Sequence, residues 1–184
     1  LYNEITTTEI DNYLAETAAA LTVEHPDYSN LAARIKANAL HKETPGFIIA
    51  NKNLYEDGLL NEEYYQKIQK NADEIESIID YDLDYNFDYF ALTTLTRAYL
   101  LKYNGKVIER PQDLWMRVAL TIACNEFDYD KVKYTYSALS KGYYTHATPT
   151  LFNSGLKMQQ LSSCFLIAME DDSIEGIFNT IKDC

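Results

Sequence analysis

Basic side chains are scarce in this sequence. Its 184 residues hold 16 Lys and Arg against 28 Asp and Glu, which gives a formal net charge of −12 and a pI near 4.6. A protein that binds along a nucleic-acid backbone or on an anionic membrane needs a basic face to neutralise the phosphates. The composition therefore argues against both partners, and any phosphate-binding site must be local.

Cysteines and long apolar runs are also few. The three cysteines, Cys124, Cys164 and Cys184, form no CxxC pair and no even-numbered framework, and no apolar leader begins the chain. No apolar run approaches the roughly 20 residues of a membrane-spanning helix. These absences predict a cytoplasmic protein with reduced thiols and no membrane partner.

Familiar catalytic motifs are missing as well. The chain has no P-loop, no GxGxxG and no GxSxG, and its histidines His25, His41 and His146 lack the spacing of a metal site. We expect no metal, and we assign His146 a hydrogen bond that fixes its loop. The chain starts at Leu1 rather than a methionine and stops at Cys184 inside a helical pattern, so we interpret it as a fragment.

Helix signals dominate the first eighty residues. Thr6 and Glu9 are spaced as a capping box for a helix from about residue 9 to 21, and Pro26 suits the first turn of a second helix. Together they predict a helical hairpin. Residues 61–79 then show the pattern of one or two amphipathic helices, whose inward positions are Tyr64, Ile68, Ile75, Ile78 and Ile79.

A short β-hairpin and two further helices are predicted next. Asn104-Gly105 is the dipeptide that best supports a two-residue turn with positive φ at both positions. Pro111 then starts a helix with an apolar stripe. Asp128 or Asp130 caps another helix, which Gly142 ends. Most of the chain is thus expected to be helical.

The densest polar signal lies between residues 143 and 155. Pro149 and Gly155 break this stretch into what reads as a loop, and it gathers hydroxyl, imidazole and amide side chains: Thr145, His146, Thr148, Thr150, Asn153 and Ser154. Hydroxyls and free backbone N–H groups can hold a phosphate without a lysine. The same residues are equally typical of a Ser/Thr-rich connector, and both interpretations stay open.

A thiol follows this loop. Ser162-Ser163-Cys164 opens an apolar run at residues 165–169 that reads as a buried strand, and Asp172 or Ser173 can cap the helix after it. A cysteine beside a phosphate cradle would face a bound sugar. The plain alternative is an ordinary core strand.

Three strings in this order resemble one family. ATPTLFNSG, QLSSCFL and MEDDSIEGI are similar, at this spacing, to the large (alpha) subunit of class I ribonucleotide reductase of the eukaryotic type. Upstream, HPDYSNLAARI, HKET, YLLKYNGKVIERPQ and LWMRVA resemble that family too. The likeness covers nearly the whole chain and is weakest between Pro45 and Tyr81.

The resemblance implies radical chemistry on ribonucleoside diphosphates. In that family a thiyl radical removes the 3′ hydrogen, the 2′ hydroxyl leaves as water, and two cysteines supply the reducing electrons. Cys164 matches one member of that reducing pair, and Thr148 and Ser163 match positions that hold the substrate. Cys124 and Cys184 are expected to be structural.

The resemblance also implies two regulatory sites. Asp172, Ser173 and Ile174 fall in the site for the deoxynucleotide that sets specificity. Thr7 and Asp11, together with Lys42, fall near an activity-controlling nucleotide. From the residues alone, however, Thr7 is a helix cap and Asp11 a solvated face, and the glycine-containing, basic start of the ATP cone is absent here.

The implied architecture has three parts. Residues 1–45 would be the end of an ATP-cone regulatory domain, 46–157 a helical domain with one hairpin, and 158–184 the first strand and helix of an otherwise missing α/β barrel. The expected fold class is thus mainly α. The family's radical cysteine, in an Asn-x-Cys-x-Glu motif, its second reducing cysteine and its C-terminal cysteine tail have no counterpart, so the fragment alone is expected to be inactive.

The partners implied are those of a reductase. They are a ribonucleoside diphosphate, ATP and deoxynucleotide effectors, a thioredoxin- or glutaredoxin-type reductant, and a small (beta) subunit that carries a radical metallocofactor. The large subunit would form a homodimer or higher oligomer, with no cofactor held directly by this segment. The alternative is a free-standing helical nucleotide-sensing or interaction module without catalysis.

Overall fold

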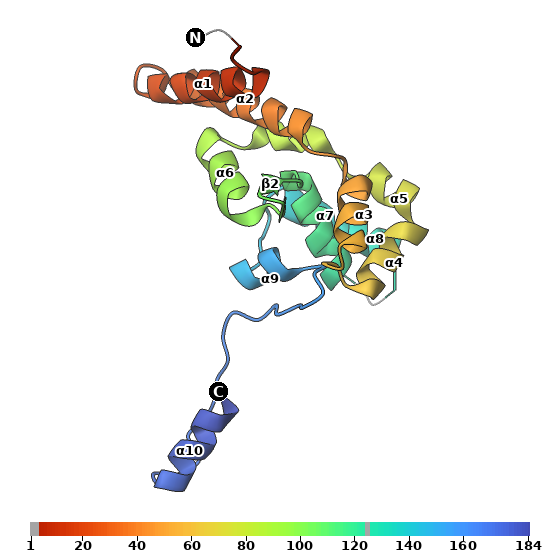
Figure 1. Ribbon diagram of the computed structural model, residues 1–184, viewed down its shortest axis with the longest axis vertical. Helices are drawn as coiled ribbons and strands as arrows, with labels where there is room; N and C mark the ends of the chain where they lie inside the picture. Colours follow the sequence, from red (N-terminus) through yellow and green to blue (C-terminus); the bar gives the residue numbers. More distant parts are fainter. Residues whose placement is uncertain (1–3, 124–125) are drawn as a thin grey trace.

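The computed structural model describes residues 4–123 and 126–184. Helices α1 (Thr7–Ala20) and α2 (Asp27–Glu43), joined by the 3₁₀ turn Leu21–Val23, form the predicted helical hairpin. Figure 1 shows the pair side by side at one end of the molecule. The capping box is confirmed, because Thr6 Oγ1 accepts from Glu9 N at 3.2 Å and Glu9 Oε2 accepts from Thr6 N at 2.9 Å.

Alanines supply most of the buried positions of this hairpin. Small side chains let two helix backbones approach closely, and the buried positions of α1 and α2 are Ala15, Ala18, Ala32, Ala33, Ala37, Ala39 and Leu40. Leu14 and Leu31 point outward instead, with 47% and 48% of their surfaces exposed. Ala33 and Ala37 pack against Leu92, and Leu40 packs into the main core, so the same helix also joins the hairpin to the rest of the molecule.

The next three helices build one side of the main body. They are α3 (Phe47–Glu56), α4 (Glu62–Lys70) and α5 (Ala72–Ile78), so the pattern at 61–79 is two helices rather than one. Four of the five predicted inward residues are buried, namely Tyr64, Ile68, Ile75 and Ile78. Ile79 is partly buried against the same core. Helix α3 lies in the expected helical domain, in the stretch where the residue pattern predicted no individual helix.

The aromatic and acidic segment that follows folds into short turns. It holds the 3₁₀ turn η2 (Tyr81–Asn86), helix α6 (Tyr89–Thr94) and the π-helical turn η3 (Leu95–Tyr99). Strands β1 (Lys102–Tyr103) and β2 (Lys106–Val107) then pair in antiparallel register, Lys102 with Val107 and Tyr103 with Lys106. The predicted turn is confirmed, because Asn104 and Gly105 have φ values of 49° and 77°.

Helix α7 (Pro111–Ile122) runs through the centre of the body (Figure 1). The sequence predicted a helix with one apolar face. Every residue from Pro111 to Leu120 is buried, so the helix is instead enclosed on all sides. Helix α8 (Tyr129–Ser140) packs along it, capped by Asp128, whose Oδ1 accepts from Lys131 N at 3.1 Å. The prediction for Cys124 lies outside the described residues.

The last forty residues depart from prediction in two places. The polar stretch expected as a loop contains a short helix, α9 (Thr148–Asn153), because Pro149 occupies a first-turn position that needs no N–H. Residues 165–169, expected as a buried strand, have no regular structure, and their side chains are exposed. That expectation is wrong, since a strand needs a paired neighbour and no described residue supplies one.

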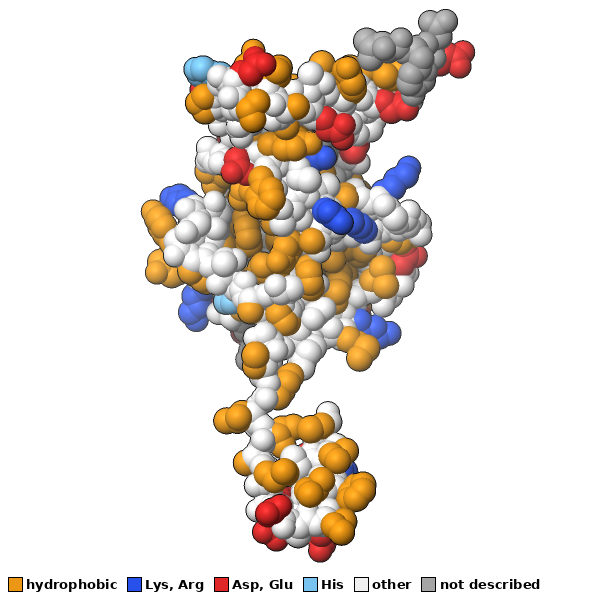
Figure 2. Space-filling model, turned by 90° about the vertical axis from the view of Figure 1, so that its left-hand side faces the viewer, with side chains coloured by type: hydrophobic (Ala, Val, Ile, Leu, Met, Phe, Trp, Pro, Cys, Tyr) orange, Lys and Arg blue, Asp and Glu red, His pale blue; other side chains and the backbone are white. Residues whose placement is uncertain are grey.

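Helix α10 (Ile174–Asp183) is confirmed, and Figure 1 shows it apart from the helical body. In Figure 2 hydrophobic side chains gather over this lower part, and the exposed ones on α10 are Ile174, Ile177, Phe178 and Ile181. Among the described residues, the only sheet is the two-stranded β1–β2 hairpin. None of the described helices is both long and apolar enough to cross a membrane.

Candidate functional site

Helix α9 carries the polar side chains of the candidate site. Thr148 stands at its first position, and its Oγ1 lies 3.4 Å from the hydroxyl of Tyr99 on η3. The Tyr99 ring also contacts Phe152, with centroids 5.0 Å apart. The π-helical end of α6 therefore braces the start of α9.

Two other side chains of α9 reach the segment that leads to the thiol. Thr150 Oγ1 donates to the carbonyl of Leu161 at 3.0 Å, and Asn153 Nδ2 donates to the carbonyl of Gln160 at 2.7 Å. The helix that holds Thr148 thus also holds the chain just before Ser163 and Cys164. Within the described chain, no direct hydrogen bond joins Thr148 to either of them.

The far end of α9 is fixed to the centre of the body by a buried ion pair. Arg117 of α7 donates from Nε to Glu109 Oε1 at 2.6 Å and from Nη2 to Glu109 Oε2 at 3.0 Å. Its remaining amino group, Nη1, donates to the carbonyl of Ser154 at 2.9 Å. Arg117 has no exposed surface and Glu109 only 4%. A paired guanidinium this deep holds α9 with directional bonds.

The thiol itself is accessible. Cys164 is a free cysteine with an exposed side chain, and Ser163 is exposed beside it. Accessibility is what thiol–disulfide exchange requires. Cys184 is also free and exposed, at the last position of the sequence, and its structural role stays a prediction.

His146 departs from its expected role. Its Nε2 is buried without a hydrogen-bond partner, and its ring packs edge-on against Tyr144 at 5.4 Å between centroids. The prediction of a loop-fixing hydrogen bond is wrong for this nitrogen. An aromatic contact orients the ring instead.

The expected effector residues surround the start of α10. Ser173 is the N-cap, because its Oγ accepts from Gly176 N at 3.0 Å, and Asp172 is exposed and is not the cap. Ile174 is exposed over 77% of its surface. A Cβ at Gly176 would come within 2.5 Å of the Asp171 carbonyl oxygen, so the turn before α10 is built around that glycine.

The expected activity-site residues lie on the α1–α2 hairpin. Lys42 Nζ donates to Asp11 Oδ2 at 2.9 Å, and the Asp11 side chain is only 20% exposed. Asp11 is therefore paired rather than a solvated face. Thr7 begins α1 one turn before Asp11, on the same side, and Thr6 rather than Thr7 is the cap.

Sequence reasoning missed a buried polar network around the start of α7. Arg110 donates from Nε to Thr44 Oγ1 at 2.8 Å and from Nη2 to the carbonyls of Thr44 and His41 at 3.1 and 3.2 Å. It therefore ties the end of α2 to α7. The one available signal was the run ERPQDLWMR, which places charged residues inside an apolar helix pattern.

Acidic side chains complete this network. Asp84 has no exposed surface and accepts from Gln112 N at 3.2 Å, while its Oδ2 lies 2.7 Å from His41 Nε2. Asp113 accepts from the Tyr81 hydroxyl at 2.7 Å and from Arg110 N at 2.8 Å. Each buried carboxylate thus has polar partners from other elements.

The pKa values of Asp113 and Arg117, both buried in the helical body, are shifted. Removal of water raises the pKa of Asp113 to about 7, although the hydrogen bonds from Tyr81 and Arg110 N oppose that shift. Burial alone would lower the pKa of Arg117, but the Glu109 carboxylate outweighs it, and the pKa is raised. Arg117 therefore stays charged, whereas Asp113 titrates near neutral pH.

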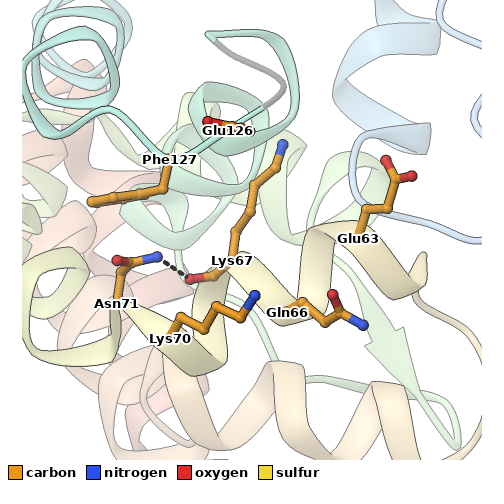
Figure 3. Close-up of a pocket in the computed structure, with 7 residues that line it drawn as sticks. All are labelled: Glu63, Gln66, Lys67, Lys70, Asn71, Glu126 and Phe127. Atoms are coloured by element: carbon orange, nitrogen blue, oxygen red, sulfur yellow. Dashed lines mark hydrogen bonds between the residues drawn. The ribbon is translucent and has the colours of Figure 1, made fainter.

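A separate cavity of about 360 Å³ opens between α4 and the chain before α8 (Figure 3). Its lining mixes acids, amides and lysines: Glu63, Gln66, Lys67, Lys70, Asn71, Glu126 and Phe127. Asn71 Nδ2 donates to the Lys67 carbonyl at 2.8 Å there. No predicted site residue lines this cavity. In the described part of the chain, no group of three or more His, Cys, Asp or Glu side chains is arranged to hold a metal ion.

Comparison with known proteins defines the class. Residues 85–159, which span η2 to α9, match the family described as "Ribonucleotide reductase, all-alpha domain". The helical body from residue 85 to residue 159 therefore matches the all-α domain of ribonucleotide reductases.

The relatives extend this over the whole chain. It is 46% identical to the "Ribonucleoside-diphosphate reductase large subunit" of Arabidopsis thaliana, 47% to large chain 2 of Saccharomyces cerevisiae and 46% to the large subunit of Danio rerio. Each alignment covers 100% of this chain and, in the same order, 24%, 22% and 24% of the relative's length. The chain belongs to the ribonucleotide reductase large-subunit family and spans about a quarter of the length of these relatives.

Proposed function

We propose that this segment is the N-terminal part of the catalytic subunit of a ribonucleoside-diphosphate reductase, which converts ribonucleoside diphosphates to deoxyribonucleoside diphosphates. The observation that carries the proposal is identity of 46–47% along the entire chain to large subunits from a plant, a fungus and an animal. That identity favours a reductase segment over a free-standing helical nucleotide-sensing or interaction module.

The chemistry assigns roles to three residues. A thiyl radical on a cysteine outside this chain takes the 3′ hydrogen atom of the substrate, and the 2′ hydroxyl leaves with a proton as water. Cys164 and a second cysteine outside this chain give up two electrons and two protons and become a disulfide. The exposed, unpaired state of Cys164 supports this role. Thr148 and Ser163 offer hydroxyls that hydrogen-bond the substrate.

The proposed regulatory sites lie at the start of α10 and on the α1–α2 hairpin. Asp172, Ser173 and Ile174 bind the deoxynucleotide that sets specificity. Thr7, Asp11 and Lys42 belong to the activity site for ATP in a cone domain that ends near residue 45. Residues 46–157 are then the helical domain, and 158–184 begin the barrel.

The proposal includes partners and compartment. The enzyme works in the cytoplasm as a homodimer or higher oligomer with a small subunit, whose metallocofactor supplies the radical, and with a thioredoxin- or glutaredoxin-type reductant. The segment lacks the Asn-x-Cys-x-Glu motif of the radical cysteine, and we expect no turnover from the 184-residue chain alone.

The test is Cys164→Ser in the complete large subunit, assayed with its small subunit and reductant. We expect multiple turnover to be lost while the Kd for ribonucleoside diphosphate stays within about twofold, because Ser keeps the size of Cys and cannot form a disulfide. Cys184→Ser is the matched control, since it removes the other exposed thiol of the described chain. Multiple turnover at the wild-type rate in Cys164→Ser would refute the assignment.

A further inference from the structure

Helix α9 binds two consecutive backbone carbonyls through two of its own side chains. The hydrogen bonds are Thr150 Oγ1 to Leu161 O at 3.0 Å and Asn153 Nδ2 to Gln160 O at 2.7 Å. Neither is a local helix bond, because the partners lie 11 and 7 residues away. Two neighbouring carbonyls held together fix both the place and the direction of the chain at that point.

The helix that makes these bonds is itself immobilised. Leu151 is buried with 7% of its surface exposed, and Ser154 has none. Arg117 donates to Ser154 O at 2.9 Å, and Asn61 N donates to Gly155 O at 3.0 Å. Helix α9 is therefore a rigid extension of the helical body. A segment that α9 binds is fixed in position relative to that body.

The two hydrogen bonds of Thr150 and Asn153, which we call the tether, hold the chain directly before the proposed reactive residues. Ser163 and Cys164 follow Leu161 by two and three residues, so the Cα of Cys164 stays within roughly 11 Å of the Cα of Leu161. In the part of the chain that the structure describes, residues 162–169 make no hydrogen bond with the helical body. Among the described residues, the hydrogen bonds of Thr150 and Asn153 are thus the last ones that the helical body makes before the thiol.

From this arrangement we infer that Thr150 and Asn153 are positioning residues for the reaction. They fix Ser163 and Cys164 relative to Thr148, which lies on the same six-residue helix. The inference rests on the proposed function, because it takes Thr148, Ser163 and Cys164 as the groups that meet the substrate. Thr150 and Asn153 act only through the backbone they hold.

The experiment uses the complete large subunit with its small subunit and reductant. Thr150→Val removes a donor at nearly constant volume, Thr150→Ser keeps it, and Asn153→Ala removes the second donor. Thr121→Val is the matched control, because Thr121 Oγ1 donates at 2.8 Å to the Arg117 carbonyl within its own helix. KM and kcat are measured together with the iodoacetamide alkylation rate of Cys164, with and without ribonucleoside diphosphate.

We expect each donor-deleting change to raise the KM for the diphosphate roughly two- to tenfold, which is the range of one hydrogen bond. Substrate should also protect Cys164 less from alkylation, because the thiol is no longer held at a fixed place relative to Thr148. Thr150→Ser and Thr121→Val should stay within about twofold of wild type. A merely stabilising role would lower the Tm and leave both KM and protection unchanged.

Unchanged KM and unchanged protection in Thr150→Val and Asn153→Ala would overturn the inference. Asn153 is only partly buried, so Asn153→Ala decides the matter if Thr150→Val does not fold. Failure of the proposed function gives a different result: wild type would not turn over the diphosphate. The alkylation rate of Cys164 without nucleotide would still rise in Asn153→Ala if the tether holds the segment.

Discussion

Removal of Arg117 is the sharpest test of how the candidate site is anchored. Arg117→Met keeps most of the side-chain volume but takes away three donors at once. Glu109 would retain only the N–H of Leu101, which donates to its Oε2 at 2.9 Å, and the carbonyl of Ser154 would lose the Arg117 bond. Both groups are in the interior, so water cannot easily replace the lost partner.

The expected cost is large because a buried carboxylate is left without its counter-charge. Breaking a buried ion pair from one side costs about 3–5 kcal/mol of the free energy of unfolding. Neutralising both partners in Arg117→Met/Glu109→Gln should cost less than the two single changes added together. We expect that difference to be roughly 2 kcal/mol or more, since the double variant buries no lone charge.

The chain contains its own reporter for this measurement. Trp115 is the single tryptophan, it is 8% exposed, and it lies two residues from Arg117 on α7. Urea unfolding of the 184-residue chain, followed by Trp115 fluorescence and far-UV circular dichroism, gives two curves that coincide if unfolding is two-state. For strongly destabilised variants, an osmolyte that is excluded from the protein surface, such as sucrose, raises the free energy of unfolding enough for it to be measured.

The result that would refute this reasoning is additivity. If the double variant loses as much as the two single variants together, Glu109 and Arg117 are not coupled. Thr121→Val serves as a control for α7 itself, because it alters a local helix bond and leaves the ion pair intact. A loss of 3 kcal/mol or more in that control would assign the effect to the helix rather than to the pair.

Three further predictions concern single positions. The folded chain holds a proton on Asp113 up to about pH 7 and the unfolded chain only up to about pH 4, so stability should fall as pH rises between these values, by roughly 3–4 kcal/mol; urea midpoints from pH 4 to 8 should show this slope in wild type and not in Asp113→Asn. Gly155→Ala should cost roughly 2–4 kcal/mol, because φ is +75° and a Cβ would lie 2.9 Å from a buried tyrosine ring. Gly142→Ala, at φ +71° with nothing within 4 Å, should cost about 1 kcal/mol in the same unfolding assay, and equal losses at the two glycines would contradict the steric argument. Asp172→Ala in the complete subunit should weaken deoxynucleotide effector binding with little change in Tm, because Ser173 is the helix cap, and calorimetric titration showing unchanged affinity would remove Asp172 from the site.

Features set by a few adjacent residues were predictable. The capping box at Thr6 and the Asn104-Gly105 turn depend on backbone geometry within four residues, and both were found where expected. The same holds for the next cap, where the structure selects Asp128 over the other candidate, Asp130. The stop at Gly142 is of the same kind, with φ +71° and a hydrogen bond from its N–H to Leu139 O at 3.0 Å. Local chemistry alone determines such elements.

Features that depend on distant partners were not predictable. Helix α9 looks like a loop because Pro149 and the threonines are poor helix formers, and its packing against α7 overrides that preference. The partners of Arg110 and Arg117 come from residues 41, 44, 109 and 154, which no spacing rule connects. The residues of the candidate site were named from family motifs, whereas their mutual placement required the structure.

The closure of the helical body has a consequence for the order in which the chain folds. Lys157 N donates to Leu59 O at 2.9 Å and Asn61 N to Gly155 O at 3.0 Å, so residues 155–157 complete the α3–α4 junction. During synthesis from the N-terminus, the residues of α3 and α4 are made long before residues 155–157. The α1–α2 hairpin is held by local contacts and can form early, whereas the helical body is complete only after residues 155–157 have been made. Until residues 155–157 have emerged from the ribosome, Leu59 O and Asn61 N at the α3–α4 junction can therefore pair only with water.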